Sequence, residues 1–149
     1  MYKKRTIFAL YRDDINNMNI VVDANIYLAV ILNEPEKQAI IEHTKGIELI
    51  SPEVLPYEIG NALSAMLKRK RLSEDQIIES FDIFNMIPLN LEPVNIAKAL
   101  NIACKFNIYA YDAYYLELSE RLKAPLLTLD NEMKDIAKIL KIKLLEIKS

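Results

Sequence analysis

The sequence contains little of several residue types, and each shortage excludes a class of function. Cys104 is the single cysteine among 149 residues, which excludes an internal disulfide framework and is typical of a reducing compartment. With two glycines, Gly46 and Gly60, the chain has no glycine-rich loop for nucleotide phosphates. His43 is the one histidine, which argues against a histidine-based metal ligand set or general base.

Long hydrophobic runs and strong net charge are also missing. No apolar run approaches the roughly 18 residues of a membrane span, and the basic start of the chain precedes an apolar segment too short for a signal peptide. We therefore expect a cytoplasmic protein with no membrane association. The net charge of −2 gives no global basic field, so contact with nucleic acid requires a local patch. Met18 is an alternative start, which would make residues 1–17 an extension with no role in the fold of residues 18–149.

What the chain has is an alternation of short apolar runs with longer amphipathic segments. Hydrophobic residues make up 52% and charged residues 27%, a globular composition at the length of one domain. The pattern predicts strands at 19–22, 47–50, 87–91, 125–129 and 142–147. It predicts helices at 24–32, 36–44, 55–69, 73–85, 93–106, 112–122 and 131–140. Strands separated by helices indicate a single α/β domain with a parallel sheet of about five strands.

Four carboxylates stand alone in otherwise uncharged stretches of the chain: Asp23, Glu58, Asp112 and Asp130. Desolvating a charged group costs several kcal/mol, so acids in core-like segments require an explanation. Glu92, beside Pro93, is equally isolated, which means that isolation alone does not identify a site.

Two explanations of these acids remain open and are compatible. Asp23, Asp112 and Asp130 each precede a predicted helix, where a capping carboxylate contributes about 1 kcal/mol; Glu58 lies inside a helix. Alternatively, the four converge. Two carboxylates about 6 Å apart repel by about 3 kcal/mol at an effective dielectric of 20, so a cluster requires cations or raised pKa values. Oxygen ligands favour Mg²⁺ or Mn²⁺, which can support phosphodiester hydrolysis.

The acids belong to four short motifs in a specific order. These are I-V-V-D-A-N at 20–25, Y-E-I-G-N-A-L at 57–63, Y-D-A-Y-Y-L-E-L-S at 111–119 and L-L-T-L-D at 126–130. In this order the motifs resemble those of PIN-domain ribonucleases, specifically the VapC-type toxins of type II toxin–antitoxin pairs. The resemblance extends over residues 18–147.

The resemblance implies a Mg²⁺- or Mn²⁺-dependent endoribonuclease, with a small antitoxin protein as partner and a homodimeric assembly. Its acidic quartet corresponds to Asp23, Glu58, Asp112 and Asp130, which would be catalytic and metal-binding. Asp23 and Asp112 would be primary ligands, and Glu58 would support the ion or the attacking water. Beside the quartet, three residues would be supporting donors: Asn25, Asn61 and Thr128. Asn25 could instead be a helix-start residue and Thr128 an ordinary strand residue.

The strongest basic run and a tyrosine cluster each have two interpretations. The run ends the helix of Glu58, where it either complements the helix dipole or contacts RNA phosphates; it comprises Lys68, Arg69, Lys70 and Arg71. Tyrosines 109, 111, 114 and 115 surround Asp112, either as packing residues or with one of them stacking a base.

Other functions stay open at this point. HAD-type phosphatases also end a first strand in Asp, but follow it with a second Asp two residues on, where this chain has Asn25. A non-toxin PIN nuclease in RNA processing and a non-catalytic RNA- or protein-binding PIN module are the remaining alternatives.

Overall fold

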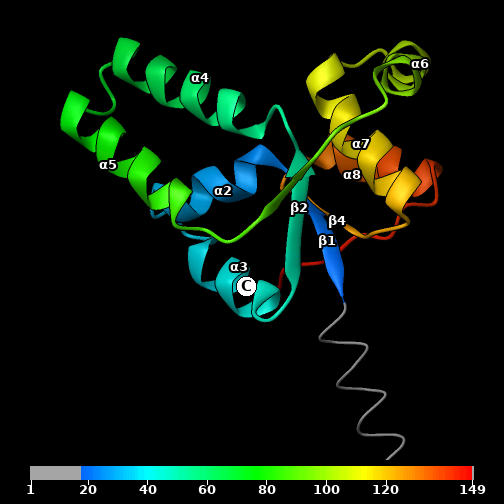
Figure 1. Ribbon diagram of the computed structural model, residues 1–149, viewed down its shortest axis with the longest axis horizontal. Coiled ribbons are helices and arrows are strands. Elements are labelled where there is room, and N and C mark those ends of the chain that lie inside the picture. Colours follow the sequence, from blue (N-terminus) through cyan, green and yellow to red (C-terminus); the bar gives the residue numbers. More distant parts are fainter. Residues whose placement is uncertain (1–17, 149) are drawn as a thin grey trace, which may run out of the picture.

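The computed structural model describes residues 18–148, so the extension predicted for residues 1–17 lies outside the described residues. A parallel four-stranded sheet with the strand order β3-β2-β1-β4 runs through the centre (Figure 1). The strands are β1 (Asn19–Val22), β2 (Glu48–Pro52), β3 (Asn90–Glu92) and β4 (Leu126–Leu127). The helices are α2 (Ala24–Ile31), α3 (Lys37–Thr44), α4 (Leu55–Lys68), α5 (Glu74–Asn85), α6 (Ile96–Phe106), α7 (Ala110–Leu122) and α8 (Asn131–Ile139).

The predicted α/β class and parallel pairing are confirmed, with a correction at the fifth strand. Residues 142–147 form no strand of their own. They add one parallel bridge, between Leu126 and Leu144, next to β4. Two backbone bonds hold it, from Leu126 N to Lys143 O at 2.8 Å and from Leu145 N to Leu126 O at 3.0 Å. Because β4 is two residues long, it offers its neighbour too little edge for a longer ladder.

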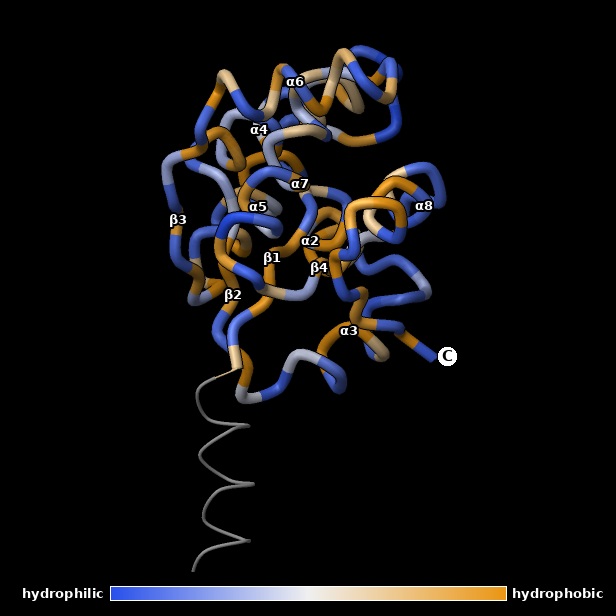
Figure 2. The backbone as a smooth tube through the Cα atoms, turned by 90° about the vertical axis from the view of Figure 1, so that its right-hand side faces the viewer, coloured by the Kyte–Doolittle hydropathy of each residue, from blue (hydrophilic) through white to orange (hydrophobic). Residues whose placement is uncertain are grey.

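Helices cover both faces of the sheet, which explains why β1 is apolar from Ile20 to Val22. Figure 1 shows α2 to α5 on the left of the sheet and α6 to α8 on the right. Ile20, Val21 and Val22 of β1 are fully buried, as expected for a parallel strand covered on both faces. Figure 2 shows apolar residues concentrated in β1, α2 and β4 at the centre of the molecule.

The strand order places a switch point beside β1, where the chain crosses to β2 on one side and to β4 on the other. In open α/β sheets, ligand sites lie at the carboxyl ends of the strands next to such a point. A buried hydroxyl pair holds this edge together. Ser51 Oγ donates to the carbonyl oxygen of Val22 at 2.6 Å, and the Tyr27 hydroxyl lies 3.0 Å from the same Ser51 Oγ. The backbone directly before Asp23 is thereby fixed.

Candidate active site

Asp23 lies at the carboxyl end of β1 and is the N-cap of α2. Its Oδ1 accepts a hydrogen bond from Ala24 N at 2.8 Å, and its Oδ2 accepts one from Thr128 Oγ1 at 2.9 Å. The side chain is 4% exposed. Burial raises the pKa of Asp23 from 3.8 to about 6, against the opposing effect of the Thr128 hydroxyl. Asp23 is therefore both a helix cap and a desolvated carboxylate.

Asp130 lies at the carboxyl edge of β4 and is joined to Asp23 through Thr128. The Thr128 hydroxyl, which donates to Asp23, also accepts a hydrogen bond from Asp130 N at 3.0 Å. Asp130 Oδ1 accepts from Met133 N at 3.0 Å, so Asp130 caps α8. The single buried hydroxyl of Thr128 thus fixes the loops that carry both acids.

Glu58 lies in the first turn of α4 and is oriented by Tyr115, which the sequence placed in the tyrosine cluster without a role toward Glu58. Its Oε1 accepts a hydrogen bond from the Tyr115 hydroxyl at 2.8 Å, and Tyr115 is fully buried. Burial raises the pKa of Glu58 from 4.5 to about 7; the charges of Asp23 and Asp112 act in the same direction, and the Tyr115 bond opposes them. The signal for Tyr115 was its position three residues after Asp112, which places both on one face of a helix.

Asp112 occupies a different position from the one predicted. The expectation that it opens and caps its helix is wrong, because α7 begins at Ala110 and its N-cap is Tyr109. Asn107 ends α6 in the left-handed conformation (φ 53°), and the extended Tyr109 then starts α7 before Asp112 is reached. Asp112 lies in the first turn instead. Burial raises its pKa, and repulsion by Asp130 and Glu132 adds to that effect.

The charges of the four acids act on one another, and within residues 18–148 none of these acids is paired with a basic side chain. The charge of Asp112 raises the pKa of both Asp23 and Glu58, and that of Asp130 raises the pKa of Asp23. Among residues 18–148 the one ion pair joins Glu117 Oε1 to Arg121 Nε at 2.8 Å, away from these acids. In that range no three Asp, Glu, His or Cys side chains lie close enough to ligate one ion as they stand. The four carboxylates therefore form no closed ligand shell in the described part of the chain.

The other predicted site residues differ in how they are placed relative to the four acids. Thr128 contacts Asp23, as described above. Asn61 follows Glu58 by one helical turn, and both residues line one small cavity. Asn25 is exposed in the first turn of α2, with no side-chain hydrogen bond to the acids in the described part of the chain. The basic run at 68–71 ends α4, about 15 Å along the helix from Glu58 at 1.5 Å per residue.

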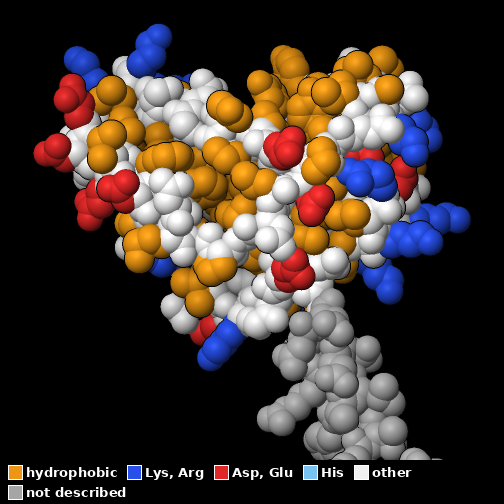
Figure 3. All heavy atoms as spheres, in the orientation of Figure 1, with side chains coloured by type: hydrophobic (Ala, Val, Ile, Leu, Met, Phe, Trp, Pro, Cys, Tyr) orange, Lys and Arg blue, Asp and Glu red, His pale blue; other side chains and the backbone are white. Residues whose placement is uncertain are grey.

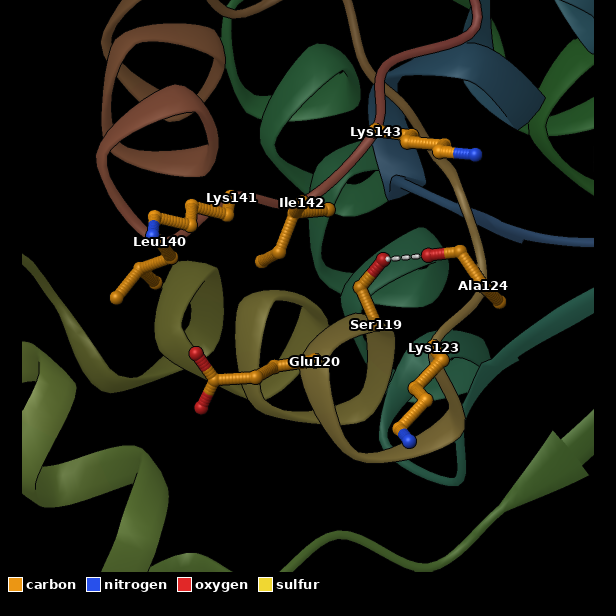
Figure 4. Close-up of a pocket in the computed structure, with 8 residues that line it drawn as sticks. All are labelled: Ser119, Glu120, Lys123, Ala124, Leu140, Lys141, Ile142 and Lys143. Carbon is orange, nitrogen blue, oxygen red and sulfur yellow. Dashed lines mark hydrogen bonds between the residues drawn. The ribbon is translucent and has the colours of Figure 1, made fainter.

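Two cavities show where a ligand could and could not approach the acids. A cavity of about 180 Å³ adjoins Glu58 and is lined by Tyr57, Glu58, Asn61, Ala62 and Tyr111. Another, of about 380 Å³, lies between the end of α7 and residues 140–143. Figure 4 shows that its lysines, Lys123, Lys141 and Lys143, extend in different directions, and its Ser119 hydroxyl donates to Ala124 O at 2.6 Å. That cavity has no convergent polar groups and lies before β4, at the edge opposite the acids.

The protein is thus a parallel α/β domain with a group of acidic side chains at the carboxyl edge of its sheet. The family model of the PIN domain matches residues 20–139, and the chain belongs to that family. The resemblance inferred from the four motifs is confirmed.

Curated relatives and solved structures agree with this assignment. Ribonuclease VapC3 of Pyrobaculum aerophilum is 29% identical, over 78% of this chain and 92% of the relative. Ribonuclease VapC9 of Mycobacterium tuberculosis is 28% identical, over 78% and 89%. The fold is similar to that of the crystal structure of PAE2754 from Pyrobaculum aerophilum (TM-score 0.64, 20% identity, 84% of this chain and 96% of the other). It is also similar to VapBC2 from Rickettsia felis, bound to a DNA fragment from their promoter (TM-score 0.58, 18% identity, 86% and 98%).

Proposed function

We propose that this protein is a metal-dependent endoribonuclease that hydrolyses RNA phosphodiester bonds, and that it is the toxin of a toxin–antitoxin pair. One observation carries the proposal. The charge of Asp112 raises the pKa of Asp23 and of Glu58, and the charge of Asp130 raises the pKa of Asp23 and of Asp112. Within residues 18–148 no basic side chain is paired with any of these four acids. In contrast, the buried Glu117 has Arg121 as its partner. Carboxylates gathered without a cation favour a ligand that carries positive charge.

The donor set fits Mg²⁺ or Mn²⁺, since it consists of carboxylate oxygens, the ligands that hard divalent ions prefer. Asp23 and Asp112 would hold the ion, with Glu58 and Asp130 beside them. When bound, such an ion supplies activation of a water molecule and neutralisation of charge on the phosphate. A bound cation would also offset the repulsion among the four carboxylates and the cost of desolvating the buried ones.

The chain's own residues would position the reacting groups. Ala24 N and Thr128 hold both oxygens of Asp23, so this carboxylate is fixed before any ligand arrives. The Tyr115 hydroxyl holds Oε1 of Glu58. No hydrogen bond within residues 18–148 engages Oε2, which leaves that oxygen for the attacking water or an ion. Tyr115 is therefore a positioning residue for Glu58 rather than a catalytic residue.

RNA as substrate and a protein as partner are supported by the relatives. The curated relatives carry the name VapC ribonuclease, and one structural neighbour is a VapBC assembly. We infer a small antitoxin partner, a homodimer and a cytoplasmic site of action. Ile78 (65% exposed) in α5 and Met86 (78% exposed) at its C-terminal end are exposed apolar side chains, which is consistent with protein contacts. Figure 3 shows apolar side chains on the part of the surface that α4 and α5 form. No helix within residues 18–148 has the length and apolar character to cross a bilayer.

The activity is tested by incubating an internally structured, 5′-labelled RNA with the protein and Mg²⁺ or Mn²⁺. Internal cleavage products that disappear in a chelator are expected, and the same sequence as DNA is the control. The absence of RNA products with either ion would overturn the proposal. Toxin function is tested separately by inducing the protein in cells: growth arrest relieved by a small protein encoded upstream is expected. Unimpaired growth despite nuclease activity would favour an RNA-processing enzyme.

A further inference from the structure

Two exposed tyrosines flank the small cavity beside Glu58. Tyr57 and Tyr111 both line the 180 Å³ cavity, from the first turns of α4 and α7 respectively. Tyr57 is 79% exposed and Tyr111 is 55% exposed. Figure 1 shows these two helix starts facing each other across the carboxyl end of β2. Large aromatic side chains that contribute so little to the core are available to an external ligand.

The other walls of this cavity limit what it can hold. Ala62 leaves room on the α4 side, and Asn61 supplies an amide that both donates and accepts hydrogen bonds. The volume lies below the roughly 300 Å³ at which drug-sized ligand pockets begin. A flat, aromatic group of the size of one base suits these dimensions better than a whole nucleotide does.

The cavity continues along an aromatic path. Tyr57 also lines a neighbouring cavity of about 340 Å³, whose other lining residues are Glu53, Val54, Pro93, Val94, Ile96 and Tyr114. Tyr114 in turn contacts Tyr111 edge-to-face, with ring centroids 6.0 Å apart. A single strand bound along this path could place successive bases against tyrosine rings. Base stacking on aromatic side chains is the general means by which proteins hold single-stranded nucleic acid.

We propose that Tyr57 and Tyr111 form a nucleobase subsite next to Glu58, in which one base beside the phosphate to be cut stacks on a tyrosine ring and Asn61 contacts its edge. The subsite rests on the proposed nuclease function and adds to it the recognition of an unpaired base. Tyr109 is the matched control, since it is 85% exposed and two residues from Tyr111 but does not line either cavity.

The test is binding of a short, unstructured, fluorescently labelled RNA to the full chain carrying Asp23→Asn, followed by anisotropy. Tyr57→Ala and Tyr111→Ala should each weaken binding about 5- to 150-fold, the range of one base stack. Tyr57→Phe and Tyr111→Phe, which keep the ring, should bind within about twofold of the parent. Tyr109→Ala should leave the affinity unchanged. Thermal melting of each variant checks that the fold is retained.

A second arm places an abasic site at each position of the RNA in turn. At one position next to the cut, losing the base should weaken binding to the parent protein but cause no further loss in Tyr111→Ala. Three results would each overturn the subsite. The alanine variants could bind as tightly as the parent, the abasic site could weaken binding equally in the parent and in Tyr111→Ala, or the RNA could fail to bind at all. If RNA cleavage by a protein with an intact Asp23 is unchanged when either tyrosine is replaced by alanine, the subsite is overturned and the nuclease proposal stands. If RNA binding depends on the tyrosines but the protein with an intact Asp23 does not cleave RNA, the nuclease proposal is overturned and the base-binding subsite is supported.

Discussion

Replacing Asp23 by asparagine should change the stability of the metal-free protein in opposite directions at low and at neutral pH. The pKa of Asp23 is raised from 3.8 to about 6, chiefly by burial. Raising a pKa by one corresponds to about 1.4 kcal/mol, so the ionised carboxylate destabilises the fold by about 3 kcal/mol. Asparagine removes that charge but weakens the contact with Thr128, at a cost of about 1 kcal/mol.

The sign of the pH dependence follows from proton binding. The folded chain holds the proton of Asp23 more tightly than the unfolded chain does, so the wild type loses stability as the pH rises from about 4 to about 6. The free energy of unfolding of Asp23→Asn should therefore lie about 1 kcal/mol below that of the wild type under acidic conditions. It should lie about 2 kcal/mol above the wild type at neutral pH.

Urea denaturation of both proteins in a chelator, from acidic to neutral pH, measures this difference. Asp135→Asn is the control, because Asp135 is an exposed carboxylate on α8 and its replacement should give no comparable pH-dependent gain. A difference between Asp23→Asn and wild type that stays constant with pH, or that becomes more destabilising toward neutral pH, would refute the reasoning. Added Mg²⁺ or Mn²⁺ should then stabilise the wild type and leave Asp23→Asn unchanged.

Three further predictions concern residues around the site. Tyr115→Phe should lower kcat about tenfold at unchanged KM, because only the orientation of Glu58 is lost; equal changes in both would indicate a packing role. Glu117→Gln should lower the free energy of unfolding by about 1–2 kcal/mol, measured in urea, with wild-type cleavage retained, since its partner Arg121 is partly exposed and can be solvated. Neutralising the basic run at 68–71 should flatten the salt dependence of RNA binding if it contacts phosphates, whereas an unchanged slope would leave it as helix-dipole complementation.

Local patterns predicted those parts of the fold that depend on local chemistry. The apolar run 20–22 followed at once by Asp23 predicted a buried strand and its helix cap, and both are present. The helix predicted at 73–85 is also present, and it begins with a capping box in which Ser73 and Gln76 form both hydrogen bonds. These features need only the residues next to them, which is why periodicity and capping rules found them.

Features that depend on distant partners were placed less well. The strand predicted at 87–91 is shifted to Asn90–Glu92, since β3 is an edge strand and its limits are set by pairing with β2. β4 ends at Leu127 rather than residue 129, because its partner β1 ends at Val22, opposite Leu127, and the chain then turns into α2. The bond from Tyr115 to Glu58 spans 57 residues, so local spacing placed Tyr115 on the helix face of Asp112 but could not identify Glu58 as its partner.

Metal-dependent RNA cleavage by wild type, Asp23→Asn and Glu117→Gln tests most directly whether the gathered carboxylates form a nuclease site. Both substitutions neutralise one buried acid, but only Asp23 belongs to the uncompensated group. With Mg²⁺ or Mn²⁺, we expect wild type and Glu117→Gln to cut at similar rates. Asp23→Asn should be slower by more than about 100-fold, since residues that merely support metal ligands are worth 10- to 100-fold. Cleavage by Asp23→Asn at the wild-type rate would contradict the assignment of the site.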